Sequence, residues 1–218
     1  MRVVVVGGHG KIARLLAPLL VARGDEVVPL VRRQEHADEL AALGTRPALL
    51  DIEAADDDDF TAAVRGADAV VFAAGAGPDG RADRKRTVDL EGSLKAQAGA
   101  LAAGVRRFVQ VSAIGVDEPI RDDTSAVWAA YVVAKRDADE ALRDSGLDWT
   151  ILRPGGLTDD PGTGRVHLAE HVGRAQVPRA DVAAVLAAVL ADDATVGHQW
   201  ELVSGSTPVP EALARATA

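Results

Sequence analysis

The sequence predicts an α/β protein with a doubly wound parallel sheet. Strand-like and helix-like runs alternate along most of the 218 residues. The first strand-like run, from Val3 to Val6, is continuously apolar and β-branched, which is typical of a strand buried on both faces. Because crossovers between parallel strands are nearly always right-handed, this alternation predicts one sheet with helices on both faces.

The expected elements follow a regular order as far as Pro154. Gly24 suits the C-terminus of the first helix, because glycine readily takes the left-handed conformation needed there. The four carboxylates of residues 56–59 favour the positive N-terminal end of the third helix. Strands are expected at residues 3–6, 26–31, 47–50, 67–73, 107–111 and 149–152, and helices at 11–23, 35–43, around 60–65, 85–103 and 126–144.

The pattern changes after Pro154. Residues 158–164 (TDDPGTG) are expected to form a loop, followed by a helix at 181–190, a strand at 199–203 and a short helix at 210–215. The sequence has no internal repeat and no low-complexity linker. We therefore expect one domain over residues 1–218, in which residues 154–218 form a small lobe at the carboxyl edge of the sheet, where ligands of open α/β sheets bind.

The composition argues against several classes of function. With 24 basic and 33 acidic residues the net charge is −9, which disfavours binding to nucleic acid. No apolar run reaches the ~20 residues that cross a bilayer, and the first apolar run is too short for a signal-peptide core. The absence of cysteine excludes disulfides and thiolate metal sites. We expect a cytoplasmic monomer or homodimer that acts on a small molecule and has no membrane partner.

The turn after the first strand has the pattern G-x-x-G-x-x-A. Gly7 stands at the tight turn, Gly10 where the backbone approaches a pyrophosphate, and Ala13 where the helix packs on the strand. Free N–H groups and the positive helix end together make an anion site. The pattern therefore predicts a bound dinucleotide. His9, inside the turn, is expected to be a solvent-facing loop residue.

The ends of the second and third strands carry residues that indicate which dinucleotide binds. Arg32 and Arg33 follow the second strand, where an NAD-specific site usually has Asp or Glu for the ribose 2′-hydroxyl. Guanidinium groups match a phosphate, so the pair favours NADP(H), with NAD(H) as the second choice. Alternatively, both are surface arginines that begin a helix. Asp51, after the third strand, is a candidate for the adenine edge, or else it caps a loop.

Tyr131, the only tyrosine of the chain, stands four residues before Lys135 in an expected helix. Residues four apart share one face of a helix. A phenol has an ordinary pKa of about 10, and a neighbouring ammonium favours its ionised form. Such a pair can protonate a carbonyl oxygen as hydride arrives. The alternative is an ordinary pair on a helix surface.

Taken together, these motifs resemble the atypical short-chain dehydrogenases/reductases, close to the NAD(P)-binding proteins that are similar to NmrA and biliverdin reductase B. The resemblance implies a Rossmann fold and a nicotinamide dinucleotide as cofactor. The matching segments run nearly end to end and are VVVVGGHGKIAR, VRRQE, LLDIE, VVFAAGAG, RFVQVSAIG, YVVAKRDADEAL, LDWTILRPGGLTDDPGTG, PRADVA and WELVSGSTPVPEAL.

The resemblance also implies which residues line the cofactor. The phosphates are expected to contact Gly7, Gly10, Lys11 and Ile12, and the 2′-phosphate Arg32 and Arg33. The adenine is expected beside Asp51 and Ile52, and the cofactor's ribose beside Ala73, Ala74 and Gly75. At the nicotinamide end, Lys135 is expected to bind the ribose, and Pro154, Gly155, Gly156 and Leu157 are expected to pack near the amide.

One departure from the family pattern concerns the residue after the fifth strand. Where these reductases place a Ser or Thr that binds the substrate oxygen, this chain has Ala113, directly preceded by Ser112. Ser112 is a candidate substitute, or it is a strand-end residue that bonds the backbone. In many atypical members the active-site residues are incomplete, so cofactor binding alone does not guarantee turnover.

The remaining polar features are expected to be structural. Residues 56–59 lack clustered His or Glu and are expected to serve a helix end, so no metal site is predicted. His167 and His171 are expected to be a surface pair, and Asp181 a helix-start carboxylate. Trp128, one turn before Tyr131, is the tryptophan that could contact substrate.

The leading hypothesis is an NADP(H)-dependent oxidoreductase that acts on a small carbonyl compound or a conjugated acceptor. Tyr131 is the candidate proton donor, Lys135 its activator and ribose anchor, and Ser112 a candidate oxygen clamp. The alternative from another class is a non-catalytic dinucleotide sensor, as NmrA-like proteins are thought to be. Epimerase or dehydratase chemistry is a further variant, and the small lobe after Pro154 argues against bulky nucleotide-sugars.

Overall fold

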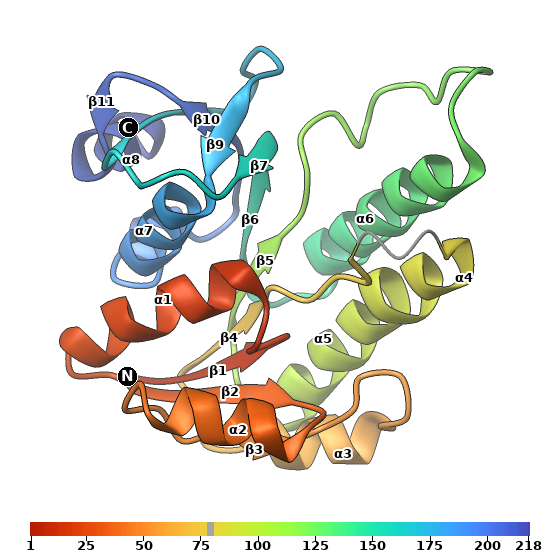
Figure 1. Ribbon diagram of the computed structural model, residues 1–218, viewed down its shortest axis with the longest axis vertical. Coiled ribbons are helices and arrows are strands. Elements are labelled where there is room, and N and C mark those ends of the chain that lie inside the picture. The colour runs from red at the N-terminus through yellow and green to blue at the C-terminus, as the bar shows by residue number, and fades with distance from the viewer. Residues whose placement is uncertain (78–80) are drawn as a thin grey trace.

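The computed structural model describes residues 1–77 and 81–218. Within these residues, nine strands form one sheet in the order β11-β8-β10-β6-β5-β4-β1-β2-β3, and two more strands, β7 and β9, pair separately (Figure 1). The strands are β1 (Arg2–Val6), β2 (Glu26–Val31), β3 (Ala48–Leu49), β4 (Ala69–Phe72), β5 (Arg107–Val111), β6 (Asp148–Pro154), β7 (Gly156–Thr158), β8 (Arg165–Ala169), β9 (Gln176–Pro178), β10 (His198–Ser204) and β11 (Thr207–Pro208).

The sheet is parallel from β3 through to β10. Its order runs outward in one direction from β1 through β2 to β3 and in the other from β4 through β5 to β6. This reversal is the topological switch point of a Rossmann-type sheet, and it confirms the predicted doubly wound fold. Within the described sheet, β8 lies between β10 and the edge strand β11 and runs antiparallel to both.

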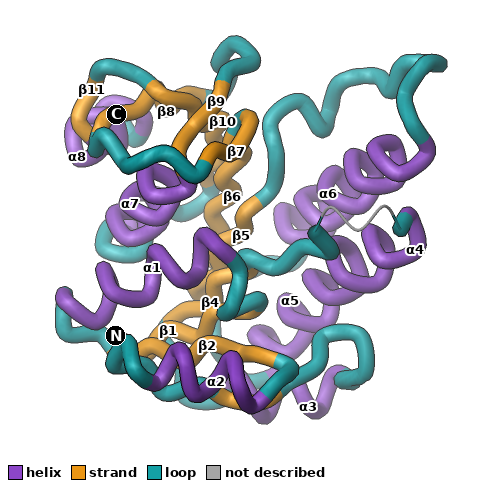
Figure 2. Tube along the Cα trace, viewed as in Figure 1, coloured by secondary structure: helices purple, strands orange, loops and turns teal. Residues whose placement is uncertain are grey.

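Helices cover both faces of the sheet, as Figure 2 shows. They are α1 (Lys11–Ala22), α2 (Gln34–Ala41), α3 (Asp57–Val64), α4 (Ala82–Arg84), the π-helical segment η1 (Lys85–Glu91), α5 (Gly92–Ala102), α6 (Ala126–Asp144), α7 (Arg179–Val189), the 3₁₀ turn η2 (Asp193–Thr195) and α8 (Val209–Ala216).

The first strand separates two apolar cores. Successive side chains of a strand point to opposite faces, so Val3 and Val5 join the core under α1, α7 and α8, while Val4 and Val6 join the core under α3, α5 and α6. The sheet is therefore buried on both sides, as the continuous apolar run predicts. This arrangement leaves the carboxyl ends of the strands as the edge at which polar loops gather.

The helix expected at residues 85–103 has a different start. It begins at Ala82, continues as the π-helical segment η1 and becomes α-helical at Gly92. Two charged side chains of η1, Lys85 and Asp89, are buried. A Cβ at Gly92 would lie 2.4 Å from Ile52 Cγ2, so this helix packs closely against the loop after β3. Wide π-helical turns often occur at functional sites.

The lobe after Pro154 holds four short strands that the periodicity does not predict, β7, β8, β9 and β11. In β8 exposed and buried residues alternate, and the exposed positions include His167. His171 lies beyond the strand and is also exposed, so these two imidazoles do not share a helix face. In the part of the chain that the structure describes, no helix is long and apolar enough to cross a membrane.

Candidate functional site

A pocket of about 270 Å³ opens at the carboxyl edge of the sheet, next to the switch point between β1 and β4. Its walls come from the turn after β1, the ends of β2 and β3 and the loop after β4. The expected cofactor residues that line it are Gly7, Gly10, Arg32, Asp51, Ile52, Ala73, Ala74 and Gly75. Four elements distant in sequence thus converge on one site. The other expected residues, Lys11, Ile12, Arg33, Lys135 and residues 154–157, lie outside this lining.

The glycine turn has the geometry that a bound diphosphate requires. Gly7 takes φ +81°, and a Cβ there would lie 2.6 Å from Ala74 Cα, so only glycine fits. Gly10 is the N-cap of α1, and no side chain caps the helix. Gly8, which the sequence pattern does not single out, packs on β2, where a Cβ would lie 2.4 Å from Pro29 Cβ. The first helix therefore presents backbone N–H groups and a positive dipole end at the pocket.

Lys11 and Ile12, at the start of α1, point in different directions. Ile12 is buried in the core, so its side chain does not face the pocket. The Lys11 ammonium pairs with Asp159, in the loop after β7, and Asp159 also accepts a hydrogen bond of 2.6 Å from Arg179 Nη1. The Lys11 hydrogen bond, assisted by the Arg179 charge, holds the pKa of the Asp159 carboxyl below its usual value. The cofactor-side helix is thus tied to the C-terminal lobe.

Two histidines lie beside the arginines that were expected at the 2′-phosphate. Arg32 lines the pocket, whereas the Arg33 guanidinium is directed to the His36 ring and to Glu35, 3.1 Å away. The His9 and His36 rings are stacked with centroids 3.5 Å apart, and both line the pocket. His9 is therefore a pocket residue, not simply a solvent-facing one. Its position three residues after Arg33, at the start of α2, could have indicated that His36 lies beside this pocket.

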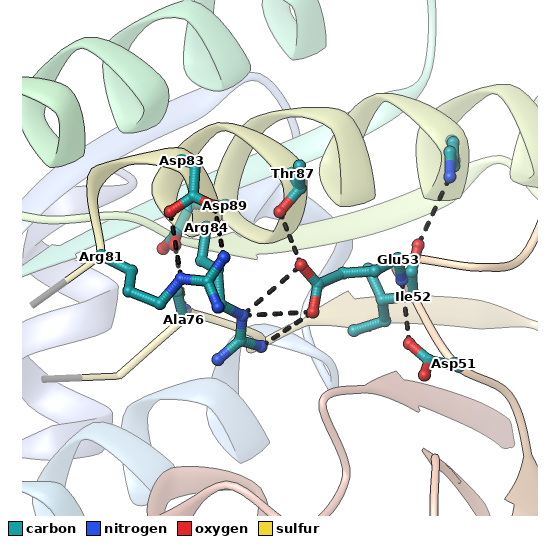
Figure 3. A network of polar contacts seen from close by, with 10 residues as sticks. Asp51, Ile52, Glu53, Ala76, Arg81, Asp83, Arg84, Thr87 and Asp89 are labelled. Atoms are coloured by element: carbon teal, nitrogen blue, oxygen red, sulfur yellow. Dashed lines mark hydrogen bonds and ion pairs between the residues drawn. The ribbon is translucent and has the colours of Figure 1, made fainter. Parts of the chain in front are cut away.

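The side of the pocket where the adenine was expected is braced by a polar network (Figure 3). Asp51 Oδ1 accepts a hydrogen bond of 3.0 Å from the Glu53 backbone N–H, which is the loop-capping role considered for Asp51. The Glu53 carboxylate accepts from Arg84 Nη2 at 2.9 Å and from Thr87 Oγ1 at 2.7 Å. These hydrogen bonds, Arg84 first, hold the pKa of Glu53 below its usual value. The loop after β3 is thereby fastened to α4 through Arg84 and to η1 through Thr87.

The Lys135 side chain is buried and its ammonium is held on several sides. Nζ lies 3.3 Å from Asp89 Oδ1 and donates to the carbonyl oxygens of Val111 at 3.1 Å and Ala74 at 3.4 Å. Burial alone would lower the pKa of Lys135, but the interactions with Asp89, Tyr131 and Asp139 together outweigh burial and raise the pKa. Asp89 also accepts from the Ala76 N–H at 3.0 Å. The charged lysine therefore lies against the loop that lines the pocket.

Tyr131 lies one turn earlier on the same face of α6, the helix whose bounds the sequence predicts. Its ring centroid is 5.1 Å from the Trp128 ring and 5.8 Å from Lys85 Nζ. Burial raises the pKa of the phenol, and Lys135 opposes this without overcoming it. The lysine has the predicted direction of effect, but the expected net lowering of the pKa does not occur because the phenol is desolvated. Tyr131 is therefore protonated at neutral pH.

Ser112 belongs to a buried polar network behind the site. Its Oγ donates to Asp139 Oδ2 at 2.7 Å, and Arg153 Nε donates to the same oxygen at 2.9 Å. Burial raises the pKa of Asp139, while the Arg153 charge works against that rise. Sequence reasoning missed Asp139, although it follows Lys135 by the same four residues that separate Lys135 from Tyr131. The Ser112 hydroxyl therefore donates its hydrogen bond to a carboxylate.

The segment after β6 packs tightly where the nicotinamide end was expected. A Cβ at Gly155 would lie 2.2 Å from the Ala175 carbonyl oxygen, so the backbones of β6 and the β9 region approach closely. Asp181 is buried in the first turn of α7 and accepts hydrogen bonds from the Thr163 N–H at 2.9 Å and the Gly164 N–H at 2.8 Å. It stands at the helix start, as expected, and also fixes the loop over residues 159–164.

The acidic run at residues 56–59 begins α3 as a capping box. Asp56 accepts from the Asp59 N–H at 2.9 Å, and Asp59 accepts from the Asp56 N–H at 3.2 Å. The predicted helix-end role of these carboxylates is confirmed. Across residues 1–77 and 81–218, no group of three or more His, Cys, Asp or Glu side chains is arranged to hold a metal ion.

Relatives resemble this chain along nearly its whole length. A Bacillus subtilis protein named uncharacterized sugar epimerase YhfK is 37% identical over 214 residues, which cover 98% of this chain and 99% of the relative. The Saccharomyces cerevisiae UPF0659 protein YMR090W is 38% identical over 220 residues, with 96% of each chain covered. These two similarities extend over both the glycine turn and the C-terminal lobe.

Solved structures share the fold. A candidate NAD-dependent epimerase/dehydratase from Bacillus halodurans superposes with a TM-score of 0.91 at 38% identity and 99% coverage of both chains. ChuY, an anaerobillin reductase from Escherichia coli O157:H7, has a TM-score of 0.77 at 25% identity and covers 94% of this chain and 97% of its own. The NAD(P)H-binding family matches residues 7–193. The chain therefore belongs to this NAD(P)H-binding family. Proteins similar to it are named as epimerases and reductases, and the resemblance to atypical short-chain dehydrogenases/reductases is confirmed.

Proposed function

We propose that the protein is an NADP(H)-dependent oxidoreductase that acts on a small carbonyl compound or a conjugated acceptor. The observation that carries the proposal is the contact between Lys135 Nζ and the Ala74 carbonyl oxygen at 3.4 Å. This contact joins the Tyr131–Lys135 face of α6 to the loop that lines the dinucleotide pocket. The contact supports an acid–base pair next to the cofactor rather than on a free helix surface.

The residues present fit a nicotinamide dinucleotide. The cradle at Gly7 would be filled by a Cβ, and the start of α1 offers backbone N–H groups without a side-chain cap. These features suit the pyrophosphate. Arg32 lines the end of the pocket where the adenosine ribose is expected. The nicotinamide supplies or accepts hydride when the cofactor is bound.

The chain's own residues supply the proton. Tyr131 keeps its proton at neutral pH because burial raises its pKa, so it can donate to an oxygen that gains negative charge. Lys135, held charged by Asp89, stabilises the phenolate that remains. Because the Ser112 hydroxyl donates its one hydrogen bond to Asp139, we propose that Ser112 positions α6 and does not bind the substrate oxygen.

The relatives support reductase chemistry on such acceptors. A Streptomyces griseus relative, 30% identical over 153 residues, is named (4-alkanoyl-5-oxo-2,5-dihydrofuran-3-yl)methyl phosphate reductase. The test is consumption of NADPH by the purified protein with a panel of aldehydes, quinones and flavins. Turnover supports the proposal. NADPH binding without turnover favours a sensor, and conversion of a sugar substrate with no net change in the nicotinamide favours an epimerase.

The cofactor preference gives a first prediction. Replacing Arg32 and Arg33 together with Ala is expected to weaken NADPH binding by at least about 100-fold, because each charged hydrogen bond to a phosphate contributes about 1.5–3 kcal/mol. NADH binding is expected to change little, since NADH lacks the 2′-phosphate. Calorimetric titration with both dinucleotides measures the difference.

Arg46→Ala is the matched control. The Arg46 side chain is 77% exposed and pairs with Glu26, and neither residue lines the pocket. It is expected to leave both affinities unchanged. Equal losses of NADPH and NADH binding in the Arg32/Arg33 variant would contradict the assignment of the 2′-phosphate to these arginines.

A further inference from the structure

Two imidazoles form part of the pocket wall at the end where Arg32 lies. His9 comes from the turn after β1 and His36 from the first turn of α2, so two separate elements bring them together. Their rings are stacked with centroids 3.5 Å apart and an interplanar angle of 3°. Both rings line the same pocket as Arg32. The stack is therefore part of the binding surface.

Each ring is held by a charged neighbour. His9 Nε2 lies 2.9 Å from Glu39 Oε2, on α2, and this contact fixes the plane against which His36 rests. His36 Nε2 contacts the Arg33 guanidinium, whose other partner is Glu35 at 3.1 Å. The charged groups that act on the His36 ring are His9 from the turn, Arg33 from the segment before α2, and Glu35 and Glu39 from its own helix.

The Arg33 contact indicates a neutral His36 ring in the free protein. A guanidinium has only donors, so the His36 nitrogen that it meets must be an acceptor, which requires a neutral ring. In agreement, burial together with the His9 and Arg33 charges lowers the pKa of His36 below its ordinary value of 6.5, against the opposing carboxylates of Glu35 and Glu39. A phosphate dianion at this end of the pocket reverses the balance, because it attracts Arg33 and favours the imidazolium.

We propose that His36, positioned by its stack on His9, is a specificity-determining residue that takes up a proton and binds the 2′-phosphate of NADP(H) together with Arg32 and Arg33. The inference rests on the proposed function, since it requires a nicotinamide dinucleotide in the pocket. The preference for NADP over NAD accordingly rises as the pH falls through the neutral range, and declines as the pH rises above the pKa that His36 has in the complex.

The direction of proton exchange distinguishes this subsite from one made of arginines alone. A phosphate monoester has its second pKa at about 6, and cationic arginines favour its dianion, so binding to arginines alone releases protons. Protonation of His36 takes protons up. Titration calorimetry with NADP and with NAD, in two buffers of different ionisation enthalpy between about pH 6 and pH 8, measures the number of protons exchanged.

We expect net proton uptake with NADP and almost none with NAD. His36→Gln is expected to weaken NADP binding about tenfold or more, to abolish the uptake and to leave NAD binding unchanged. His9→Gln, which removes the stacking partner and not the proposed phosphate ligand, is expected to reduce both effects in part. His198→Gln is the matched control, because His198 is stacked on Trp200, on β10, and does not line the pocket.

Proton release by the wild type on binding NADP, or an NADP affinity unchanged in His36→Gln, would overturn the inference and leave the oxidoreductase proposal standing. Failure of the folded protein to bind either NADP or NAD would overturn both. The two failures are therefore distinguished within one set of titrations, with circular dichroism of each variant as the check of folding.

Discussion

Replacement of Tyr131 with Phe is expected to lower kcat/KM for carbonyl reduction by about 100- to 10,000-fold, the usual contribution of a general acid. The substitution keeps the ring, which packs at 5.1 Å from Trp128, and removes only the hydroxyl. NADPH affinity and thermal stability are therefore expected to stay close to wild type. Stopped-flow measurement of NADPH oxidation, with calorimetry for binding, tests both halves of the prediction.

The pH profile provides a second readout for the same residue. Because burial raises the pKa of the phenol above its ordinary value of 10.0, a rate that needs the protonated form stays level through neutral pH and declines only at strongly alkaline pH. Undiminished turnover in Tyr131→Phe would show that another group delivers the proton. In that case the Lys135 contact to Ala74 would have only a structural role.

Replacement of Arg153 with Met is expected to destabilise the protein by about 3–5 kcal/mol. Asp139 is completely buried, and Arg153 Nη2 lies 2.8 Å from its Oδ2. Removing the guanidinium leaves the Asp139 carboxylate buried without its ionic partner, which costs more than the loss of the pair itself. Urea unfolding monitored by circular dichroism measures the change in the free energy of unfolding.

Arg106→Met is the matched control, because the Arg106–Asp148 pair at 3.1 Å is largely exposed and such pairs contribute about 0–1 kcal/mol. Adding Asp139→Asn to Arg153→Met removes the unpaired charge of Asp139 and is expected to recover part of the lost stability. If Arg153→Met proves as mild as the control, the buried Arg153–Asp139 pair does not make the expected contribution to stability.

The sequence predicts the central part of the fold well, because its signals there are local. The bounds expected for the second strand, the fifth strand and the helix at 126–144 coincide with β2, β5 and α6. A continuous apolar run or a long amphipathic pattern indicates its strand or helix without information from the rest of the chain. The four strands β7, β8, β9 and β11 have no such signal, because they are two to five residues long and partly exposed.

The candidate site likewise contains residues that local sequence signals predict and residues that they do not. Residues at strand ends, such as Gly7, Arg32 and Ala74, could be placed in advance, because the carboxyl ends of parallel strands meet at one edge. The partners of Lys135 and Ser112 could not, since Asp89 and Asp139 lie 46 and 27 residues away in sequence. Burial of Tyr131, which reverses the expected direction of its pKa, likewise depends on packing that no local pattern reveals.

In the structure, the Asp159 carboxylate pairs with the Lys11 ammonium, which the family resemblance implies as a ligand of the cofactor phosphates. An anion that binds Lys11 must first displace the Asp159 carboxylate, which then keeps its ion pair with Arg179. The exchange is easy, because both members of the Lys11–Asp159 pair are more than half exposed and such pairs are weak. A diphosphate that bound Lys11 would therefore take the ammonium group away from Asp159 and release this tie on the 159–164 loop.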